Sequence, residues 1–234
     1  MNTRQSILKR NVESVLERIE AAASRANRSR DEITLVAVTK YVDSDVVLDL
    51  ASTGIQTFGE SRPQVLWDKF ERLQDEKFEW HLIGHLQRNK VKRTLPMVSM
   101  IHSVDSLRLL AEIEKEARAA ATRISVLLEF NISGDVAKHG ISDTDLDAMV
   151  GLSIESPAVE IVGLMGMGGL ASSEAETRQQ FAELRNRRDA MAARFPDELD
   201  LKFLSMGMSG DFEWAIEEGA THVRIGSVLF DGIR

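Results

Sequence analysis

The stretch TLVAVTK, residues Thr34 to Lys40, decides the fold class of this chain. Its four central apolar residues, LVAV, form a run that is too short for a helix and contains β-branched side chains. Such a run is typical of a strand buried on both faces, as in a parallel sheet. The run ends in a lysine, which predicts an amine at the exit of a buried strand. The role of this amine depends on what else the chain places at the same edge.

Short apolar runs alternate with longer amphipathic segments along the rest of the chain. We predict strands over 34–40, 57–60, 79–84, 100–104, 124–132, 159–165, 203–206 and 222–226, and helices between them over 43–52, 63–74, 88–95, 106–120, 143–153, 174–194 and 211–218. Repeated strand–helix order implies parallel pairing with right-handed crossovers.

The predicted strands fit one closed architecture. Eight of them suit a single (β/α)8 TIM barrel, which is preceded here by an extra N-terminal amphipathic helix. An open doubly wound sheet is the alternative. Since no linker rich in Pro, Gly or Ser divides the chain, we expect a single domain over residues 1–234.

Composition narrows the classes of function. The 234 residues are 43% hydrophobic and carry a formal net charge of -8 at pH 7, which argues against a general nucleic-acid binder. The absence of cysteine excludes disulfides, thiol nucleophiles and thiolate metal sites. The charged N-terminus has no apolar signal-peptide core, and no segment reaches the length of a membrane span. We therefore expect a cytoplasmic protein with no membrane partner.

Polar or glycine-rich residues follow every predicted strand. In a (β/α)8 barrel these strand ends converge on one rim, where the active sites of the fold lie. A lysine at a strand exit is usually solvated. Partial burial in apolar surroundings instead favours a neutral amine, which can form a Schiff base. For Lys40 the choice between these interpretations depends on whether the rim also holds a cofactor site.

The last two strand ends offer such a site. In LSMGMSGDFEWAIEEG, residues 204–219, Ser209 precedes a helix, where free N–H groups favour an anion; a simple helix cap by Ser209 or Asp211 is equally compatible. Gly226 and Ser227 follow the final strand, and the loops after strands seven and eight are the usual phosphate site of this fold. Arg224 on the strand predicts either an ion pair or a fixed cation that faces a cofactor ring nitrogen.

Other motifs carry less weight. GMGGLA, residues 166–171, fits a dinucleotide-binding pattern weakly, because the next helix begins several residues later. His81 and His85 have i, i+4 spacing but lie in a predicted strand and loop, so we expect no metal site. The basic run 88–93 is typical of a solvated helix face, and methionines near the rim are typical of core packing.

Over nearly its whole length the chain resembles the YggS/PROSC family of pyridoxal-phosphate-binding proteins, the PLP homeostasis proteins. The matching stretches are LVAVTK (35–40), FGESRPQ (58–64), WHLIGHLQRNKVK (80–92), IHSVDS (101–106), NISGDVAKHG (131–140), GLMGM (163–167) and LSMGMSGDFEWAIEEGATHVRIGS (204–227). The resemblance implies a barrel like the N-terminal domain of fold-type III PLP enzymes such as alanine racemase.

The resemblance also implies residue roles. Lys40 corresponds to the position that forms the Schiff base with pyridoxal 5'-phosphate (PLP), and Arg224 to the arginine opposite the pyridine nitrogen. The phosphate-binding positions are Ser209, Gly226 and Ser227, and the positions lining or near the pocket are Met206, Gly207, Asn131, Met165, His85 and Ser61. The family usually has Asn at the position of Ser61, and a proline is common where this chain has Gly168 and Gly169.

By this resemblance the protein is a non-catalytic monomer that acts in intracellular PLP (vitamin B6) and amino-acid homeostasis, with apo forms of PLP enzymes as recipients. The alternative is a PLP-dependent enzyme such as an amino-acid racemase, which needs an acid/base on each face of the substrate. The sole tyrosine, Tyr41, follows Lys40 directly, so strand alternation predicts that the two side chains point apart. A third interpretation is a barrel that binds a different phosphorylated ligand.

Overall fold

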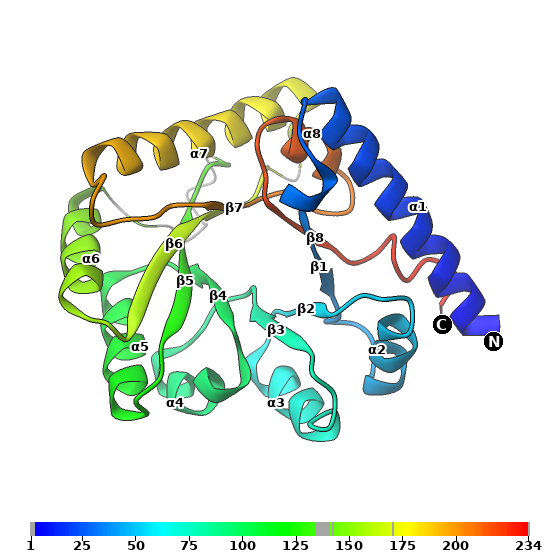
Figure 1. Ribbon diagram of the computed structural model, residues 1–234, viewed down its shortest axis with the longest axis horizontal. Helices are drawn as coiled ribbons and strands as arrows, with labels where there is room; N and C mark the ends of the chain where they lie inside the picture. The colour runs from blue at the N-terminus through cyan, green and yellow to red at the C-terminus, as the bar shows by residue number, and fades with distance from the viewer. Residues whose placement is uncertain (1–2, 134–140, 142, 170, 234) are drawn as a thin grey trace.

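The computed structural model describes residues 3–133, 141, 143–169 and 171–233. Its eight strands, all parallel, close into a barrel in sequence order, with β8 pairing back onto β1 (Figure 1). The predicted (β/α)8 barrel is thereby confirmed, and the open doubly wound sheet is wrong. No helix in the described part of the chain is long and apolar enough to cross a membrane.

The strands are short and mostly buried. They are β1 (Thr34–Val38), β2 (Thr57–Glu60), β3 (Glu79–Leu82), β4 (Met100–Val104), β5 (Ile124–Phe130), β6 (Val159–Gly166), β7 (Phe203–Ser205) and β8 (His222–Ile225). Several end one or two residues before the predicted boundary. This matters most at β1, because Thr39 and Lys40 lie beyond the strand.

Helices surround the barrel. They are α1 (Thr3–Arg25), α2 (Ser44–Ala51), α3 (Pro63–Arg72), α4 (Val91–Thr94), α5 (Leu107–Ala119), α6 (Asp143–Glu155), α7 (Glu174–Arg194) and α8 (Phe212–Glu217). Three 3-10 turns, η1 (Arg30–Glu32), η2 (Arg88–Lys90) and η3 (Leu95–Met97), complete the set.

The predicted helix over 88–95 is wrong as a continuous element. The segment divides into η2, the single turn α4 and η3. Pro96 lies in η3 and has no N–H to donate to the preceding turn, so α4 cannot continue through it, whereas the break between η2 and α4 precedes this proline.

The predicted N-terminal helix is present as α1 and closes the outer layer between α2 and α8 (Figure 1). Its apolar stripe is buried, and polar contacts join both of its ends to neighbours: Gln5 Nε2 donates to Asp49 Oδ1 of α2 at 2.7 Å, and Arg18 pairs with Glu213 of α8 at 2.6 Å. The Asn11 amide donates to the carbonyls of Leu229 and Asp231 and holds the C-terminal turn on α1.

Strand alternation produces two apolar layers. On β5, Val126 and Leu128 belong to the large cluster between the sheet and the helices, whereas Leu127 packs with Met100, Val162 and Met165 in a smaller cluster. Because successive side chains point to opposite faces, the smaller cluster lies on the inner face of the barrel. Polar side chains share this interior, as described below.

Candidate functional site

The loops after β7 and β8 are joined to one another at the rim. The backbone N–H of Gly226 donates to Ser209 Oγ at 3.1 Å. Gly207 adopts φ +91°, and a Cβ there would lie 2.6 Å from the Cβ of Ala215, so only glycine fits. In this conformation the Gly207 carbonyl accepts the Arg224 N–H at 3.0 Å. The structure therefore brings Gly207, Ser209, Arg224 and Gly226 together, as the sequence predicted.

The same loops present donors that suit an anion. In the turn after β8, Leu229 N–H donates to Gly226 O, and within the described chain the N–H groups of Ser227 and Val228 find no acceptor. Ser227 is exposed and lines a cavity of about 370 Å³ beside α1, and a Cβ on Gly210 would meet nothing within 4 Å. Open space, hydroxyls and unpaired N–H groups fit a phosphate.

Arg224 is buried and held at both ends of its guanidinium. Nη1 donates to Ser205 Oγ at 2.6 Å, and Nη2 donates to the carbonyl of Gly166 at 3.0 Å. Burial lowers the pKa of Arg224 to about 10, against the opposing effect of Glu129 and Asp211. The side chain thus remains a cation at neutral pH, and no carboxylate in the described residues lies within ion-pair distance. Of the two predicted roles, an ion pair is wrong, and a fixed cation agrees with this geometry.

Lys40 stands beyond the end of β1 and is exposed. Its Nζ lies 5.0 Å from the ring centroid of Tyr41, whose side chain is 86% exposed. Of the two interpretations of Lys40, the structure shows the solvated side chain and not the partly buried one, and the prediction that Tyr41 points away from Lys40 is wrong. Strand alternation does not apply because β1 ends at Val38, and both residues lie in the following turn. A Cβ on Gly226 would lie 3.4 Å from that of Val38, so the phosphate-type loop borders the turn that carries Lys40.

A buried ion pair fixes the peptide that leads into Lys40. Lys69 Nζ donates to the carbonyl of Thr39 at 2.6 Å and lies 3.4 Å from Glu60 Oε1. Burial lowers the pKa of Lys69 and raises the pKa of Glu60, and each partner opposes the shift of the other. Glu60 Oε2 is buried and has no partner in the described residues. The pair anchors the backbone on the N-terminal side of Lys40.

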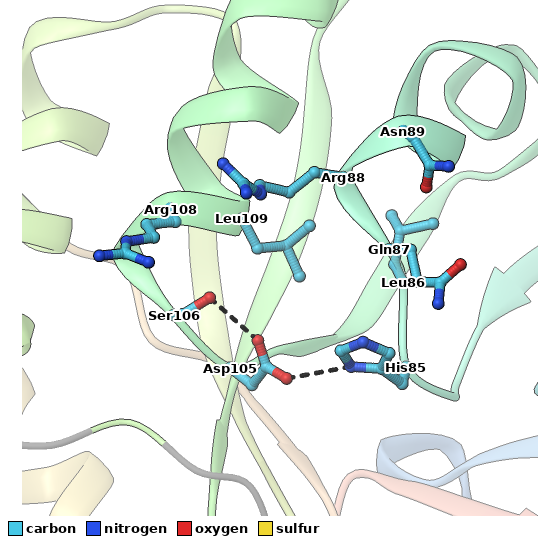
Figure 2. Close-up of a pocket in the computed structure, with 9 residues that line it drawn as sticks. All are labelled: His85, Leu86, Gln87, Arg88, Asn89, Asp105, Ser106, Arg108 and Leu109. Atoms are coloured by element: carbon cyan, nitrogen blue, oxygen red, sulfur yellow. Dashed lines mark hydrogen bonds and ion pairs between the residues drawn. The ribbon is translucent and has the colours of Figure 1, made fainter.

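His85 occupies a separate part of the rim. Figure 2 shows it paired through Nδ1 with Asp105 Oδ2, near Arg88, Arg108 and Leu109. The two paired atoms lie 3.2 Å apart, and these residues line a cavity of about 540 Å³. The cavity is formed by the segments that follow β3 and β4, whereas the phosphate-type loops follow β7 and β8.

The remaining predicted residues are spread over the rim and the core. Met206 is fully buried in the large cluster, and Met165 in the inner one. Asn131 is exposed and its Oδ1 accepts from the Ser133 N–H at 3.2 Å. The carbonyl of Ser61 packs against Gly84, where a Cβ would lie 2.3 Å away. Of the stretch NISGDVAKHG, residues 134–140 lie outside the described structure.

The glycine-rich loop after β6 contacts α7. The N–H of Gly169 donates to Gln180 Oε1 at 2.9 Å, and a Cβ on Gly168 would lie 3.3 Å from Thr177 Cγ2. The dinucleotide-binding interpretation of this loop is wrong, because it required an open sheet and β6 belongs to a closed barrel.

Polar residues inside the barrel were missed by the sequence analysis. His81 on β3, His102 on β4, Ser205 on β7 and His222 on β8 are all buried, and they contact one another or Arg224. The sequence does contain a signal for them, because each lies within a strand that is otherwise rich in apolar residues. Buried polar groups need hydrogen-bond partners, so these residues could have been expected to contact one another. The two histidines with i, i+4 spacing lie apart: His81 lies in the interior of the barrel and His85 at its rim.

Comparison with known proteins gives one consistent family. Residues 11–233 match the family described as alanine racemase, N-terminal domain. The pyridoxal phosphate homeostasis protein of Aquifex aeolicus is 40% identical over 216 residues, which cover 92% of this chain and 94% of the relative. PipY of Synechococcus elongatus, solved with PLP bound, superposes with a TM-score of 0.80 at 32% identity, covering 91% of this chain and 99% of PipY.

A more distant structural match supports the fold of this chain and says nothing about its function. Alanine racemase from Streptomyces coelicolor superposes with a TM-score of 0.70 at 15% identity, and the match covers 97% of this chain but 58% of the racemase. At this identity the likeness concerns the barrel alone. The fold-type III barrel expected from the sequence is thereby confirmed.

Proposed function

This chain belongs to the pyridoxal phosphate homeostasis proteins of the alanine racemase N-terminal domain family, and from that premise we propose that it binds PLP at the rim formed by β1, β7 and β8. The observation that carries the proposal is the junction of the two phosphate-type loops, Ser209 Oγ to Gly226 N, next to the turn that bears Lys40. We propose that residues 1–234 act as one PLP-binding domain.

When bound, PLP supplies an aldehyde that condenses with an amine and a pyridine ring that withdraws electrons. The exposed Lys40 is the residue that offers this amine, and Ser209, Gly226 and Ser227 offer the donors for the phosphate. Gly207 shapes the loop, and Arg224 would offer a donor to the pyridine nitrogen of the bound cofactor. The residues assigned to the surroundings of the cofactor are Ser61, Asn131, Met165, Met206 and His85.

A carrier suits these residues better than an enzyme. An arginine donates hydrogen bonds but does not readily give up a proton, so Arg224 leaves the ring nitrogen unprotonated and weakens the ring as an electron sink. The exposure of Lys40 also leaves the attachment point accessible to solvent. We therefore favour a non-catalytic protein that holds PLP and passes it on.

The test begins with the absorbance spectrum of the protein incubated with PLP, followed by borohydride reduction and peptide mapping. We expect a band that disappears on reduction and an adduct on Lys40. Lys40→Ala should lose the band, whereas Lys92→Ala, which changes another exposed lysine, should keep it. An adduct on another lysine, or a band that persists in Lys40→Ala, contradicts the assignment; no band in the unaltered protein favours a different phosphorylated ligand.

One observation favours the enzyme alternative and defines its test. Tyr41 is the sole tyrosine of the chain, and its ring lies beside Lys40 Nζ. Racemisation needs acid/base groups on opposite faces of the substrate, and two residues of one turn are poorly arranged for that. We expect no interconversion of L- and D-alanine by the PLP-loaded protein. Turnover that is abolished in Lys40→Ala and reduced in Tyr41→Phe would show that the protein is a racemase.

Three further proposals concern its setting: the protein is cytoplasmic, it is a monomer, and its recipients are apo forms of PLP enzymes. Light scattering of the PLP-loaded chain should give a mass near the 26.1 kDa of one chain. Transfer is tested by mixing the loaded protein with an apo-enzyme and a PLP-trapping agent, since direct transfer restores activity despite the trap. Restoration that the trap abolishes would refute direct delivery.

A further inference from the structure

A continuous line of polar contacts crosses the inside of the barrel and ends at Arg224. Arg224 Nη1 lies 2.6 Å from Ser205 Oγ, Ser205 Oγ lies 2.8 Å from His102 Nδ1, and His102 Nε2 lies 3.0 Å from His81 Nδ1. β4 and β7 are separated in the sheet by β5 and β6, so the contact between His102 and Ser205 crosses the interior. All of these side chains are at least 95% buried.

The chemistry of Arg224 fixes the direction of the first hydrogen bond in this line and suggests one direction for the others. An arginine has donors only, so Ser205 Oγ accepts from Nη1, and its own hydroxyl hydrogen is left for His102. When His102 Nδ1 accepts this hydrogen, the His102 proton is on Nε2, which donates to His81 Nδ1. The His81 proton is consequently on Nε2, which lies 3.5 Å from Glu79 Oε1.

The two ends of the line carry opposite charges. Glu79 begins β3, at the end of the barrel opposite the rim, and its side chain is half exposed. Burial lowers the pKa of His102 well below its ordinary value, and protonation of His81 would lower it further, which keeps the His102 imidazole neutral and able to accept. The other charged or titratable groups that act on the line are His222, Glu129 and Asp211. Every bond in the line is therefore consistent with one proton arrangement.

We propose that Ser205, His102 and His81 are positioning residues that hold Arg224 in place against the ring nitrogen of PLP. Ser205 and the Gly166 carbonyl each accept from one terminal nitrogen of the guanidinium, so the two bonds together fix the plane of the group. Without the Ser205 hydroxyl as acceptor, the guanidinium keeps only its hydrogen bond to the Gly166 carbonyl and is free to rotate about it. The histidines act through Ser205, because they orient its hydroxyl away from Arg224. The inference rests on the proposed function for its ligand, but its proton arrangement is testable without PLP.

The first experiment uses the unaltered protein without PLP. Two-bond 1H–15N correlation spectra report which ring nitrogen of each of the five histidines carries the proton. We expect both His102 and His81 to carry it on Nε2 at neutral pH. A proton on Nδ1 of His102, or a doubly protonated His102, overturns the proposal even if PLP does bind.

The second experiment measures the affinity and the spectrum of PLP in three variants. Ser205→Ala should weaken binding roughly tenfold and alter the band, because a hydrogen bond to a charged group is lost. Ser205→Thr, which keeps the hydroxyl, should restore both properties. His222→Gln is the matched control, since His222 lies in the same cluster, with its ring centroid 5.8 Å from that of His102, but bonds to neither Ser205 nor Arg224.

The outcomes separate the two proposals. If the unaltered protein does not bind PLP, the proposed function fails, while the imidazole spectra still decide the arrangement of the line. If it binds PLP and Ser205→Ala retains its affinity and spectrum, the positioning role is refuted. If His222→Gln weakens binding as much as Ser205→Ala, the effect is general destabilisation, and the positioning role is refuted as well.

Discussion

Acid should destabilise this barrel through His222, and the effect is large enough to measure. The ring is buried beside His81 and His102, and its Nδ1 contacts Thr221 Oγ1 at 3.0 Å. Burial, together with the charges of His81 and Arg224 and against the effect of Glu79, lowers its pKa from 6.5 to about 3. The variant that removes this titration is His222→Gln, which cannot take up the proton.

The sign follows from proton linkage. Below pH 6.5 the unfolded chain binds a proton at this residue, and the folded protein does not until the pH approaches about 3. The contribution of the neutral His222 ring to the free energy of unfolding is therefore fully present above pH 6.5. It is lost as the pH falls from 6.5 toward about 3. Each pH unit is worth about 1.4 kcal/mol, so moving from neutral pH to pH 5 should cost about 2 kcal/mol of unfolding free energy through His222 alone.

The assay compares urea unfolding of the unaltered protein and His222→Gln at pH 7 and pH 5, with the three tryptophans as the fluorescent probe. His102 acts in the same direction in both proteins, and His222 contributes less to the lowered pKa of His102 than burial and His81 do, so the difference between the proteins reports mainly His222. The unaltered protein should lose about 2 kcal/mol more than the variant. Equal losses, or His222 ring signals that titrate between pH 5 and 7, would refute the reasoning.

Three further substitutions test the packing around the site. Gly207→Ala should cost about 2–4 kcal/mol of unfolding free energy, from the left-handed φ and the contact with Ala215, whereas Gly210→Ala, which meets no atom, should stay within about 0.5 kcal/mol in the same thermal unfolding assay. Asp49→Ala removes the acceptor of Gln5 and the ion-pair partner of Arg4, and should cost about 1 kcal/mol in urea unfolding; no change would mean that the apolar stripe alone holds α1. Lys69→Met leaves the buried carboxylate of Glu60 unpaired and should cost about 3–5 kcal/mol, with partial recovery in Lys69→Met/Glu60→Gln. A double variant less stable than Lys69→Met would contradict that reasoning.

The barrel itself was predictable because its signal is local and repeated. Each strand is a short buried run, each helix follows with its own period, and parallel connection is the arrangement that satisfies this order. The convergence of Ser209, Arg224 and Gly226 followed from the same logic, since the carboxyl ends of barrel strands share one rim. Over 88–95 the pattern indicated one helix where the structure has short turns, and Pro96 accounts only for the end of α4.

The sequence alone therefore determined the order of the elements, the closed barrel and the edge at which Lys40 lies. Only the tertiary structure decided how individual side chains are used. The turn after β1 exposes Lys40 beside Tyr41, and closure of the barrel brings His102 within 2.8 Å of Ser205, a residue 103 positions away. Hydrophobic periodicity reports which face of an element is buried. It does not report which polar groups meet inside, because that depends on how strands distant in the chain are placed across the closed barrel.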